Sequence, residues 1–498
     1  MIAKRTIMLP RTWTVLLCGM IALSLHAQGL ATIYSFDIPT GFVIQGSAPL
    51  LQCIDGNFYG TTSAGGTGGP YPGVGTVYKV SPSGAHTTLY NFCSSANCTD
   101  GQNPNTGLVQ AANGNLYGTT NGGGANAGPY AGGAGSVFKI TPTGVLTTVY
   151  SFCSQSACAD GANPTTGLVL ATNGDLYGTT NLGGTNTSAI GSAGCGTVFK
   201  MTLTGSLTTL YSFCSQSACA DGAEPNTTLL QAASGELYGS AYYGGMQDNG
   251  TIFSITPTGT LTTLYSLSDA VSGAGSSGLI QGSDGNLYGT THGGGAHSEG
   301  TVFRITPAGK LKTLYSFCAE TGCTDGAGPA GSLVQATDGN FYGTTVGGGT
   351  NGGFYGTIFK VTSRGELTTL YSFCTQSNCA DGENPYQGLI QDTDGSFYGT
   401  TSWGGAFSDG AAFSLAVGLA PFVKPQPSSG KVGAVIEILG TNLTGATSVT
   451  FSGTAATFKV ASSSLIVAAV PAGASDGNIQ VVTPTGTLSS NVPFRVLP

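Results

Sequence analysis

Short apolar segments separated by turn residues recur along most of the chain. In one copy, they cover residues 107–111, 115–120, 136–140 and 146–152. An Asn-Gly pair joins the first two segments, and this pair is the strongest short-range signal for a β-hairpin. Thr-Pro-Thr-Gly joins the last two, with proline setting φ and glycine taking the position that is strained for other residues. Each copy therefore predicts four antiparallel strands.

A Tyr-Gly pair in the second predicted strand marks seven copies of the pattern, at Tyr59, Tyr117, Tyr177, Tyr238, Tyr288, Tyr342 and Tyr398. Repeats of about 50 residues with four strands each are typical of propeller blades. Apolar residues lie on both sides of the third and fourth strands, which indicates that both faces of each sheet are buried between neighbours.

The two ends of the repeat region complement each other. Residues 31–36 form a lone fourth strand, and the last copy stops after its third strand, residues 411–415. Together they would complete one blade. A solenoid would need capping copies instead. We therefore predict an all-β fold in which residues 29–418 form a seven-bladed β-propeller of four-stranded blades, closed by the N-terminal strand.

Residues 419–498 have a different pattern. A proline-rich junction at residues 421–427 is followed by short strands with turn signals, which predicts a small immunoglobulin-like β-sandwich. This segment contains neither His nor Cys, which argues against a catalytic or metal-binding role for it.

Residues 1–28 have the pattern of a secretory signal peptide. Lys4, Arg5 and Arg11 precede or flank an apolar stretch at residues 14–25, and Ala27 is a small residue near a plausible cleavage site. The apolar stretch is too short for an ordinary membrane span, which needs about 20 residues. We expect the mature protein to be secreted or associated with the cell envelope, with no membrane span.

Charge narrows the choice of partner. Cleavage after residue 28 would remove three basic residues and no acidic ones, so the formal net charge of −8 would become −11. A chain this acidic lacks the basic surface that nucleic acids or anionic membranes attract. We expect an extracellular glycan or protein as partner, no nucleic acid, and a monomeric protein.

Ten of the thirteen cysteines form Cys-x4-Cys pairs. The pairs are Cys93/Cys98, Cys153/Cys158, Cys214/Cys219, Cys318/Cys323 and Cys374/Cys379. One copy lacks both cysteines, as expected if the two members bond to each other. Disulfides are natural in an exported protein. Zinc is the alternative, but each pair lacks a second pair nearby and the chain has only four histidines. Cys53 and Cys195 are expected to form no disulfide.

The recurring motifs Gly-Asn-Leu-Tyr-Gly-Thr-Thr, Gly-Thr-Val-Phe-Lys-Ile-Thr and Leu-Thr-Thr-Leu-Tyr-Ser-Phe resemble the bacterial GloVer tandem repeat, over residues 31–417. The resemblance implies an exported, choice-of-anchor surface protein and brings no assigned reaction or catalytic residue. Residues 433–443, 448–453, 470–473 and 491–496 are similar to the IPT/TIG immunoglobulin-like domain, which implies a spacer or adhesion module.

Loop lengths distinguish the two faces of the predicted propeller. The hairpins after the first and third strands are short and uniform, and we call this side the flat face. The connections after the second and fourth strands are long and variable, and the Cys-x4-Cys loops lie among them. We call that side the braced face. Because variable loops on a rigid scaffold commonly carry function, we expect the binding surface on the braced face, around the central funnel.

An Asp-Gly pair follows each second cysteine, giving candidate ligands at Asp100, Asp160, Asp221, Asp325 and Asp381. A ring of carboxylates could hold calcium or contact sugar hydroxyls. No cofactor is predicted, and calcium is the only candidate. The interpretation we favour is that each aspartate caps a tight turn, because the clustered carboxylates of an EF-hand loop are missing.

Two further sets of residues lie on the predicted braced face. His292, His297 and Glu299 share one loop and are candidate metal ligands, although three glycines between them give a poor frame. Aromatic residues in the glycine-rich loops suit carbohydrate or peptide contacts, the alternative being exposed rings without a ligand. They are Tyr71, Tyr130, Tyr242, Tyr243, Tyr355 and Trp403.

No Ser-His-Asp order, nucleophile elbow or histidine-rich metal motif is visible, and no residue is predicted to be catalytic. We expect an exported, non-enzymatic binding or scaffold protein that makes carbohydrate or protein contacts. The alternative is a polysaccharide-active hydrolase or lyase that uses paired carboxylates in the propeller funnel.

Overall fold

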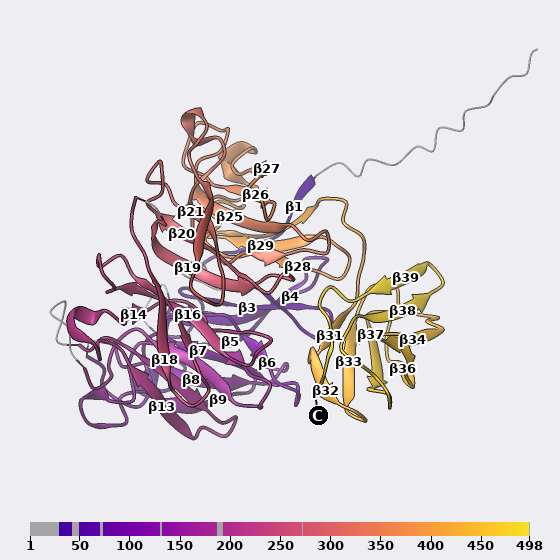
Figure 1. The fold of residues 1–498 in the computed structure, drawn as a ribbon, viewed down its shortest axis with the longest axis horizontal. Coiled ribbons are helices and arrows are strands. Elements are labelled where there is room, and N and C mark those ends of the chain that lie inside the picture. The colour runs from indigo at the N-terminus through magenta and orange to yellow at the C-terminus, as the bar shows by residue number, and fades with distance from the viewer. Residues whose placement is uncertain are drawn as a thin grey trace, which may run out of the picture.

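The computed structural model describes residues 29–41, 49–69, 73–129, 132–186, 193–270 and 272–497. The predicted signal peptide, Tyr71 and Tyr130 lie outside the described residues. The described chain is built from β-strands (Figure 1), and its helices are short 3-10 turns. None of these turns has the length or apolar character that a membrane-crossing helix requires.

Seven antiparallel sheets follow one another along the described repeat region, and we number them in chain order. Sheet 1 consists of β2 (Leu51–Gln52), β3 (Phe58–Thr62), β4 (Thr76–Val80) and β5 (His86–Asn91). Sheet 2 consists of β6 (Val109–Gln110), β7 (Leu116–Thr120), β8 (Ser136–Ile140) and β9 (Leu146–Ser151). Sheet 3 consists of β10 (Val169–Leu170), β11 (Leu176–Thr180), β12 (Thr197–Met201) and β13 (Leu207–Ser212). Sheets 4 and 5 consist of β14 (Ala223–Pro225), β15 (Leu230–Gln231), β16 (Leu237–Tyr243), β17 (Thr251–Ile255) and β18 (Leu261–Ser266); and β19 (Ala274–Gln281), β20 (Leu287–Gly293), β21 (Thr301–Ile305) and β22 (Leu311–Ser316). Sheets 6 and 7 consist of β23 (Ala327–Pro329), β24 (Val334–Gln335), β25 (Phe341–Gly347), β26 (Thr357–Val361) and β27 (Leu367–Ser372); and β28 (Ile390–Gln391), β29 (Phe397–Thr401), β30 (Ala411–Ala416) and β1 (Gly29–Ser35).

Five sheets have the four strands predicted, and sheets 4 and 6 have five. In sheet 4, both β14 and β15 pair with β16. The extra strand β14 pairs with the last residues of β16, which continues to Tyr243, two residues farther than the corresponding β11 of sheet 3. This extension lies beside the pocket described below.

The Tyr-Gly pair has a packing role in each sheet. In sheet 2, Gly118 of β7 lies opposite Phe138 of β8. A Cβ added to Gly118 would lie 2.6 Å from the Phe138 ring and 2.8 Å from Leu108. Glycine therefore makes room for the aromatic ring of the next strand, while Tyr117 on the opposite side is buried.

Sheet 7 joins the two ends of the repeat region. β1 pairs antiparallel with β30, from Gly29 opposite Ala416 to Ser35 opposite Ala411. The predicted pairing of the N-terminal strand with the last repeat is thus present.

Seven buried apolar clusters connect consecutive sheets. One cluster brings Phe36 and Tyr398 of sheet 7 together with Phe58 and Tyr78 of sheet 1. The Phe58 and Tyr398 rings have centroids 4.3 Å apart. Sheet 7 therefore packs against sheet 1 in the same manner as other neighbouring sheets do.

Glutamine side chains on the first strands connect the sheets near the flat face. Gln231 of sheet 4 accepts a hydrogen bond from the backbone N–H of Thr172 in sheet 3, at 2.9 Å. Between sheets 1 and 7 the connection differs, because Gln52 donates to the carboxylate of Asp392. Equivalent backbone-to-glutamine bonds join Ile54 to Gln110, Ala233 to Gln281, Ser283 to Gln335 and Thr337 to Gln391.

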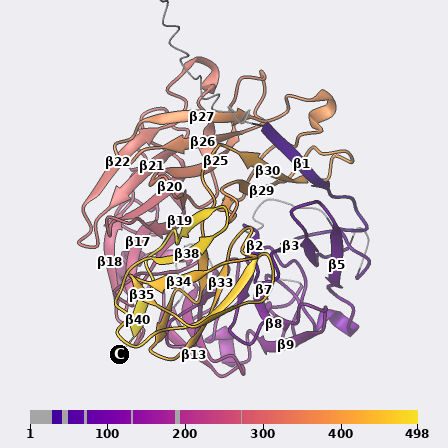
Figure 2. The ribbon, with the colours of Figure 1, turned by 90° about the vertical axis from the view of Figure 1, so that its right-hand side faces the viewer.

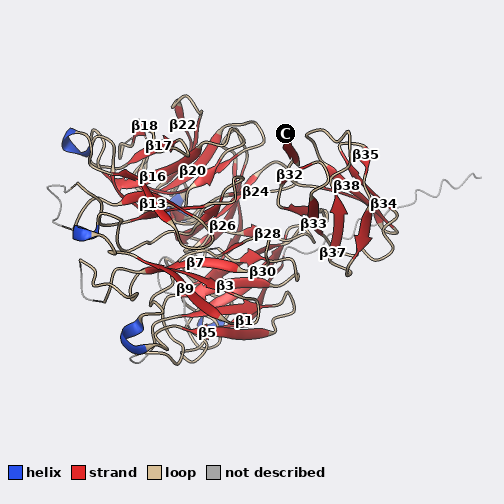
Figure 3. Ribbon diagram, turned by 90° about the horizontal axis from the view of Figure 1, so that it is seen from below, coloured by secondary structure: helices blue, strands red, loops and turns tan. Residues whose placement is uncertain are grey.

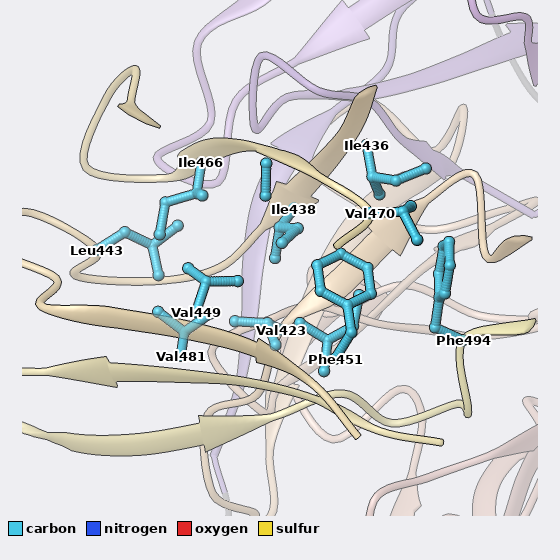
Figure 4. Packing of buried hydrophobic residues seen from close by; sticks show 12 residues of the cluster. Val423, Ile436, Ile438, Leu443, Val449, Phe451, Ile466, Val470, Val481 and Phe494 are labelled. Atoms are coloured by element: carbon cyan, nitrogen blue, oxygen red, sulfur yellow. The ribbon is translucent and has the colours of Figure 1, made fainter. Parts of the chain in front are cut away.

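The C-terminal segment is a β-sandwich with its own core. One sheet contains β31 (Lys424–Gln426), β33 (Val435–Leu439), β37 (Leu465–Ala469) and β36 (Phe458–Val460); the other contains β35 (Thr454–Ala455), β34 (Ser448–Phe451), β38 (Ile479–Thr483) and β39 (Gly486–Ser489); β32 (Ser429–Lys431) pairs in parallel with β40 (Arg495–Leu497). Its buried core (Figure 4) includes Phe451 and Phe494, whose rings pack edge to face with centroids 5.1 Å apart.

The sandwich rests on the flat face, as Figures 1 and 2 show. Its residues contact the short hairpins of sheets 7, 1 and 4. Phe422 N–H donates to Thr393 O at 2.9 Å, and Gln426 Nε2 donates to Gln52 O at 3.4 Å. Arg495 Nη1 donates to Ala233 O at 2.6 Å. Because sheets 1 and 4 are three sheets apart, the sandwich reaches across this face.

Candidate functional site

The five predicted aspartates lie inside the loops that follow the outer strands. Each loop contains a 3-10 turn, at η1 (Ala96–Cys98), η2 (Ser156–Cys158), η3 (Ser217–Cys219), η4 (Thr321–Cys323) and η5 (Ser377–Cys379). In the second loop, Asp160 accepts hydrogen bonds from Tyr150 Oη at 2.7 Å and from the N–H groups of Ser154 and Gln155 at 3.0 and 3.1 Å. Figure 3 colours these 3-10 turns blue, and those at the left of the view lie on the side of the repeat region away from the sandwich.

The same set of contacts recurs at Asp100, Asp221, Asp325 and Asp381, and all five side chains are buried. Burial acts to raise the pKa of Asp381, but hydrogen bonds from Tyr371, Thr375 and Gln376 outweigh it and hold the pKa below its usual value. These carboxylates therefore cap turns. They do not form a solvent-facing ring for calcium or sugar, which corrects that part of the expectation.

All five predicted disulfides are present, from Cys93–Cys98 to Cys374–Cys379. Cys53 and Cys195 are buried and form no disulfide, as predicted. Each disulfide closes the same loop that the aspartate caps, so the two features stabilise one turn together.

The metal candidate is not assembled. Among the described residues, His292, His297 and Glu299 do not form a group whose ligand atoms all lie within 4.8 Å of one another. His292 lies in strand β20 and lines a pocket, whereas His297 lies in the turn that follows the strand, and both side chains are exposed. The backbone of Glu299 forms an isolated β-bridge with the backbone of Gly294. The glycine-rich turn thus separates the three side chains.

The predicted aromatic residues divide into two groups. Tyr242 and Trp403 are exposed at 42% and 44% of their surface, and Tyr243 is half-buried. Tyr355 instead packs against the apolar cluster between sheets 6 and 7, so it is a core contact rather than an exposed ring. Tyr242 and Tyr243 remain as candidates beside a pocket.

A pocket of about 620 Å³ lies where the first strands of the seven sheets begin. Every sheet contributes to its wall, through Pro49, residues 105–106, 165–167, 226–228, 275–278, 330–332 and 386–388. The ends of second strands add Asn181, Tyr242, Tyr243 and His292. These ends lead into the long loops, so the pocket lies on the braced face.

Several polar atoms in this wall are buried without a hydrogen-bond partner among the described residues. They are Asn105 Oδ1, Thr165 Oγ1, Asn226 Oδ1, Ser276 Oγ and Gln387 Nε2. Ser276 is only 1% exposed and Gln387 only 4%. Buried polar groups in folded proteins are almost always satisfied, because leaving one unpaired costs about 1–3 kcal/mol. These five atoms mark the polar part of the pocket wall.

The sheets differ at one backbone position beside the pocket. This position has a left-handed φ of 53° to 65° in six sheets, at Asn103, Asn163, Glu224, Gly275, Gly328 and Asn384. In three of them, the asparagine amide donates to a carbonyl of the preceding sheet, as Asn163 Nδ2 does to Asn121 O at 2.9 Å. Asparagine tolerates this conformation well, whereas glutamate rarely adopts it.

Glutamate replaces asparagine in sheet 4, and glycine replaces it in sheets 5 and 6. Glu224 cannot donate to the preceding sheet when ionised; instead it accepts a hydrogen bond from Asn181. Opposite Gly275 lies the Tyr242 ring, 3.0 Å from the place a Cβ would occupy, and His292 lies equally close to Gly328. Glycine thus allows an aromatic ring of the preceding sheet to lie against the backbone.

These departures gather on one side of the pocket. We call Asn181, Glu224, Tyr242, Tyr243 and His292 the Glu224 corner; all five line the pocket. Burial raises the pKa of Glu224, and the hydrogen bond from Asn181 partly offsets this effect. The rings of Tyr242 and Tyr243 pack edge to face with centroids 4.8 Å apart. Among the described lining residues, Glu224 is the one carboxylate, and there is no Lys or Arg.

Models of protein families match almost the whole chain. The Gloeobacter/Verrucomicrobia repeat matches residues 19–190, 185–324 and 318–448. The chain belongs to the Gloeobacter/Verrucomicrobia repeat family. An IPT/TIG domain matches residues 423–496 of this Gloeobacter/Verrucomicrobia repeat protein, which agrees with the C-terminal sandwich. A search of curated proteins found no match.

Solved structures give only distant likenesses to this repeat protein. A Bacteroides thetaiotaomicron protein of unknown function is 14% identical, with 78% of this chain and 97% of that chain covered and a TM-score of 0.38. An auxiliary nutrient binding protein from Bacteroides ovatus is 16% identical, with coverages of 62% and 68% and a TM-score of 0.38. A luciferin-regenerating enzyme is 11% identical, with coverages of 64% and 92% and a TM-score of 0.38. With TM-scores below 0.5, these likenesses carry no argument about function.

Tyr242, Tyr243 and His292 were predicted from the sequence, whereas Glu224, Asn181 and the polar ring of the pocket, formed by Asn105, Thr165, Asn226, Ser276 and Gln387, were not. The sequence does contain a feature that distinguishes Glu224 from the equivalent residues of the other copies. Alignment of the copies puts Glu224-Pro225 where others have Asn103-Pro104 or Asn163-Pro164. A charged residue at a position that elsewhere holds a structural amide departs from the local rule, and such departures are expected at functional sites.

Proposed function

We propose that this Gloeobacter/Verrucomicrobia repeat protein is an exported, non-enzymatic binding protein that holds an extracellular glycan in the pocket of the braced face. Its seven sheets would be the blades of a seven-bladed β-propeller, closed by β1, and its TIG domain would serve as a second contact or spacer module. Residues 1–28 would direct export.

Two observations support closure of the ring. Sheet 7 contains both chain ends of the repeat region, since β1 pairs with β30. Sheet 7 also contacts sheet 1 through the Phe58–Tyr398 stack and through the bond from Gln52 to Asp392. A ring that closes in this way has no exposed end sheets and needs no capping repeat.

The polar ring of the pocket is the single observation that carries the binding proposal. Five buried atoms there lack a partner among the described residues, and two aromatic side chains flank them. Hydroxyl-rich ligands offer both donors and acceptors, and their apolar C–H faces pack against aromatic rings. A glycan therefore matches the wall better than an apolar ligand would.

The hydrolase or lyase alternative receives less support. Glycoside hydrolysis ordinarily uses two carboxyl groups that flank the scissile bond. The described lining residues include one, that of Glu224. The five turn-capping aspartates are buried in their turns, and no aspartate is among the described residues that line the pocket.

A glycan array on residues 29–498, with and without calcium, would test the proposal. Binding would then be measured by calorimetry with cello-, xylo- and chito-oligosaccharides. We expect Gln387→Leu and Tyr242→Ala each to weaken binding of the recognised saccharide about tenfold, which is about 1.4 kcal/mol.

Phe407→Ala is the matched control, because Phe407 is 61% exposed and does not line the pocket. It should leave the affinity unchanged. Binding that survives both pocket substitutions, or that responds only to changes on the flat face, would contradict the proposed site. Release of reducing ends from any saccharide would contradict the non-enzymatic function.

A further inference from the structure

We propose that the saccharide held in this pocket carries a protonated amine, as an amino sugar does, and that Glu224 is the residue that binds the amine. The inference rests on the proposed function and adds the chemical class of the ligand. It derives from the way the Glu224 corner departs from the other sheets.

Glu224 gives up a structural contact that asparagine makes elsewhere. At the equivalent position, Asn103, Asn163 and Asn384 donate to a carbonyl of the preceding sheet at 2.9 Å. The backbone at Glu224 is unchanged, with φ of 53° and its N–H bonded to Cys195 O at 2.8 Å. A non-glycine residue in this conformation is strained, and asparagine adopts it more readily than glutamate does. Glutamate at this position therefore stabilises the fold less than the asparagine of the other sheets does.

Among the described residues, the carboxylate has no cationic partner. The described lining residues include no Lys or Arg, and the salt bridge found in the described part of the chain joins Lys200 to Asp175, which do not line the pocket. Its hydrogen-bonding neighbour is the neutral Asn181. Burial of a lone carboxylate is unfavourable, and an ammonium group on the ligand would remove that penalty through a charge-assisted hydrogen bond.

The surroundings also favour a cation with several donors. Tyr243 lies within electrostatic range of the Glu224 carboxylate, its ring packs at 79° against that of Tyr242, and aromatic faces attract cations. Elsewhere in the pocket wall, the unpartnered atoms of Asn105 and Asn226 are acceptors, while those of Thr165 and Ser276 are hydroxyls that can also accept. A protonated amine with neighbouring hydroxyls supplies donors for each of these groups.

The test compares saccharides that differ in one functional group. Calorimetry on residues 29–498 at pH 6 would use glucosamine oligomers, their N-acetylated forms and cello-oligosaccharides of equal length, together with a glucuronate oligomer. We expect the glucosamine oligomer to bind at least tenfold more tightly than its N-acetylated form. The glucuronate oligomer should bind most weakly.

Two variants locate the effect. Glu224→Gln should weaken binding of the glucosamine oligomer about tenfold or more and leave the neutral oligomers within about twofold. Glu224→Asn restores the residue of the other sheets, so it should fold at least as stably as the parent while losing the preference for the amine. Glu383→Gln is the control, because Glu383 is a half-buried carboxylate of sheet 7 outside the pocket lining.

The outcomes separate the two proposals. Equal binding of amine and N-acetyl forms, or an amine preference that survives both Glu224 variants, would overturn the role of Glu224 while leaving the glycan pocket in place. Failure of the parent protein to bind any saccharide would overturn both the role of Glu224 and the proposed function.

Discussion

The braced face and the flat face are built from the same repeat but are stabilised in different ways. On the braced face, five of the loops that follow the outer strands are each held by a buried aspartate and a short disulfide. On the flat face, glutamines connect six of the seven pairs of neighbouring sheets, and the sandwich spans several hairpins. The braced face can therefore vary loop by loop, whereas the flat face depends on contacts between sheets.

This contrast explains where the candidate site lies. Loops that are stabilised locally can change sequence without disturbing the next sheet, as the differences between sheets 3 and 4 show. The pocket takes its wall from the inner edge of this variable face. The opposite face carries the sandwich and is committed to a structural contact.

Removal of a turn-capping aspartate should have the largest effect. Asp160→Ala leaves Tyr150 Oη and the N–H groups of Ser154 and Gln155 without their acceptor in a buried turn. We expect a loss of about 3 kcal/mol in the free energy of unfolding, measured by denaturant titration. Asp175→Ala removes the surface ion pair to Lys200 on the flat face and should reduce the stability by less than about 1 kcal/mol. Equal losses would refute local bracing.

Titration of Asp392, on the flat face, should make the free energy of unfolding depend on pH. Burial and the nearby Asp394 raise its pKa from 3.8 to about 6, although bonds from Thr393 and Gln52 oppose this. The folded state therefore binds the proton more tightly than the unfolded state does. Its contribution to stability is present below about pH 4 and is lost as the pH rises to about 6.

Asp392→Asn removes this titration. Between pH 4 and 6, we expect the parent to lose about 2 kcal/mol more stability than the variant does. Parallel stability curves for the two proteins across this range would show that Asp392 does not supply the dependence. Asp338→Asn is a suitable control, since Asp338 lies in the equivalent hairpin of sheet 6 and is exposed.

Loss of one disulfide should have a smaller and local effect. Replacing both Cys153 and Cys158 by serine opens a loop of about six residues, worth about 1–2 kcal/mol in the chain-entropy model. Hydrogen exchange should speed up in residues 153–161 more than elsewhere. The loop between sheets 4 and 5 has no disulfide and instead contains a β-bridge between Ser268 and Gly273. The fold should therefore survive the loss of one disulfide. Protection lost evenly across all sheets would contradict local bracing.

The contact from Arg495 to Ala233 should matter least. The arginine side chain is exposed although its donor lies 2.6 Å from the carbonyl oxygen. Arg495→Ala should reduce stability by less than about 1 kcal/mol, but it should raise protease susceptibility of the junction at residues 417–423. Unchanged proteolysis would indicate that the remaining contacts of Phe422 and Gln426 suffice to hold the sandwich.

The repeat made much of the fold predictable. The Asn-Gly turns, the Tyr-Gly pair and the paired cysteines each act over a few residues, so the strands, hairpins and disulfides could be inferred from the sequence. The pairing of β1 with β30 was also predictable, because the two ends of the repeat complement each other. The split of the first strand in sheets 4 and 6 was not, since it depends on how far β16 and β25 extend.

The candidate site was less predictable, for a physical reason. Its wall takes two or three residues from each copy, and only their convergence at the inner edges of the sheets turns ordinary Asn, Thr and Ser residues into a polar pocket. The sequence by itself determined the repeat, its turns and its disulfides, because these depend on neighbouring residues. The tertiary structure alone decided that the aspartates are buried, that His292 lines the pocket whereas His297 does not, and that Glu224 shares the pocket wall with Tyr242 and Tyr243. These outcomes depend on the packing of one sheet against the next.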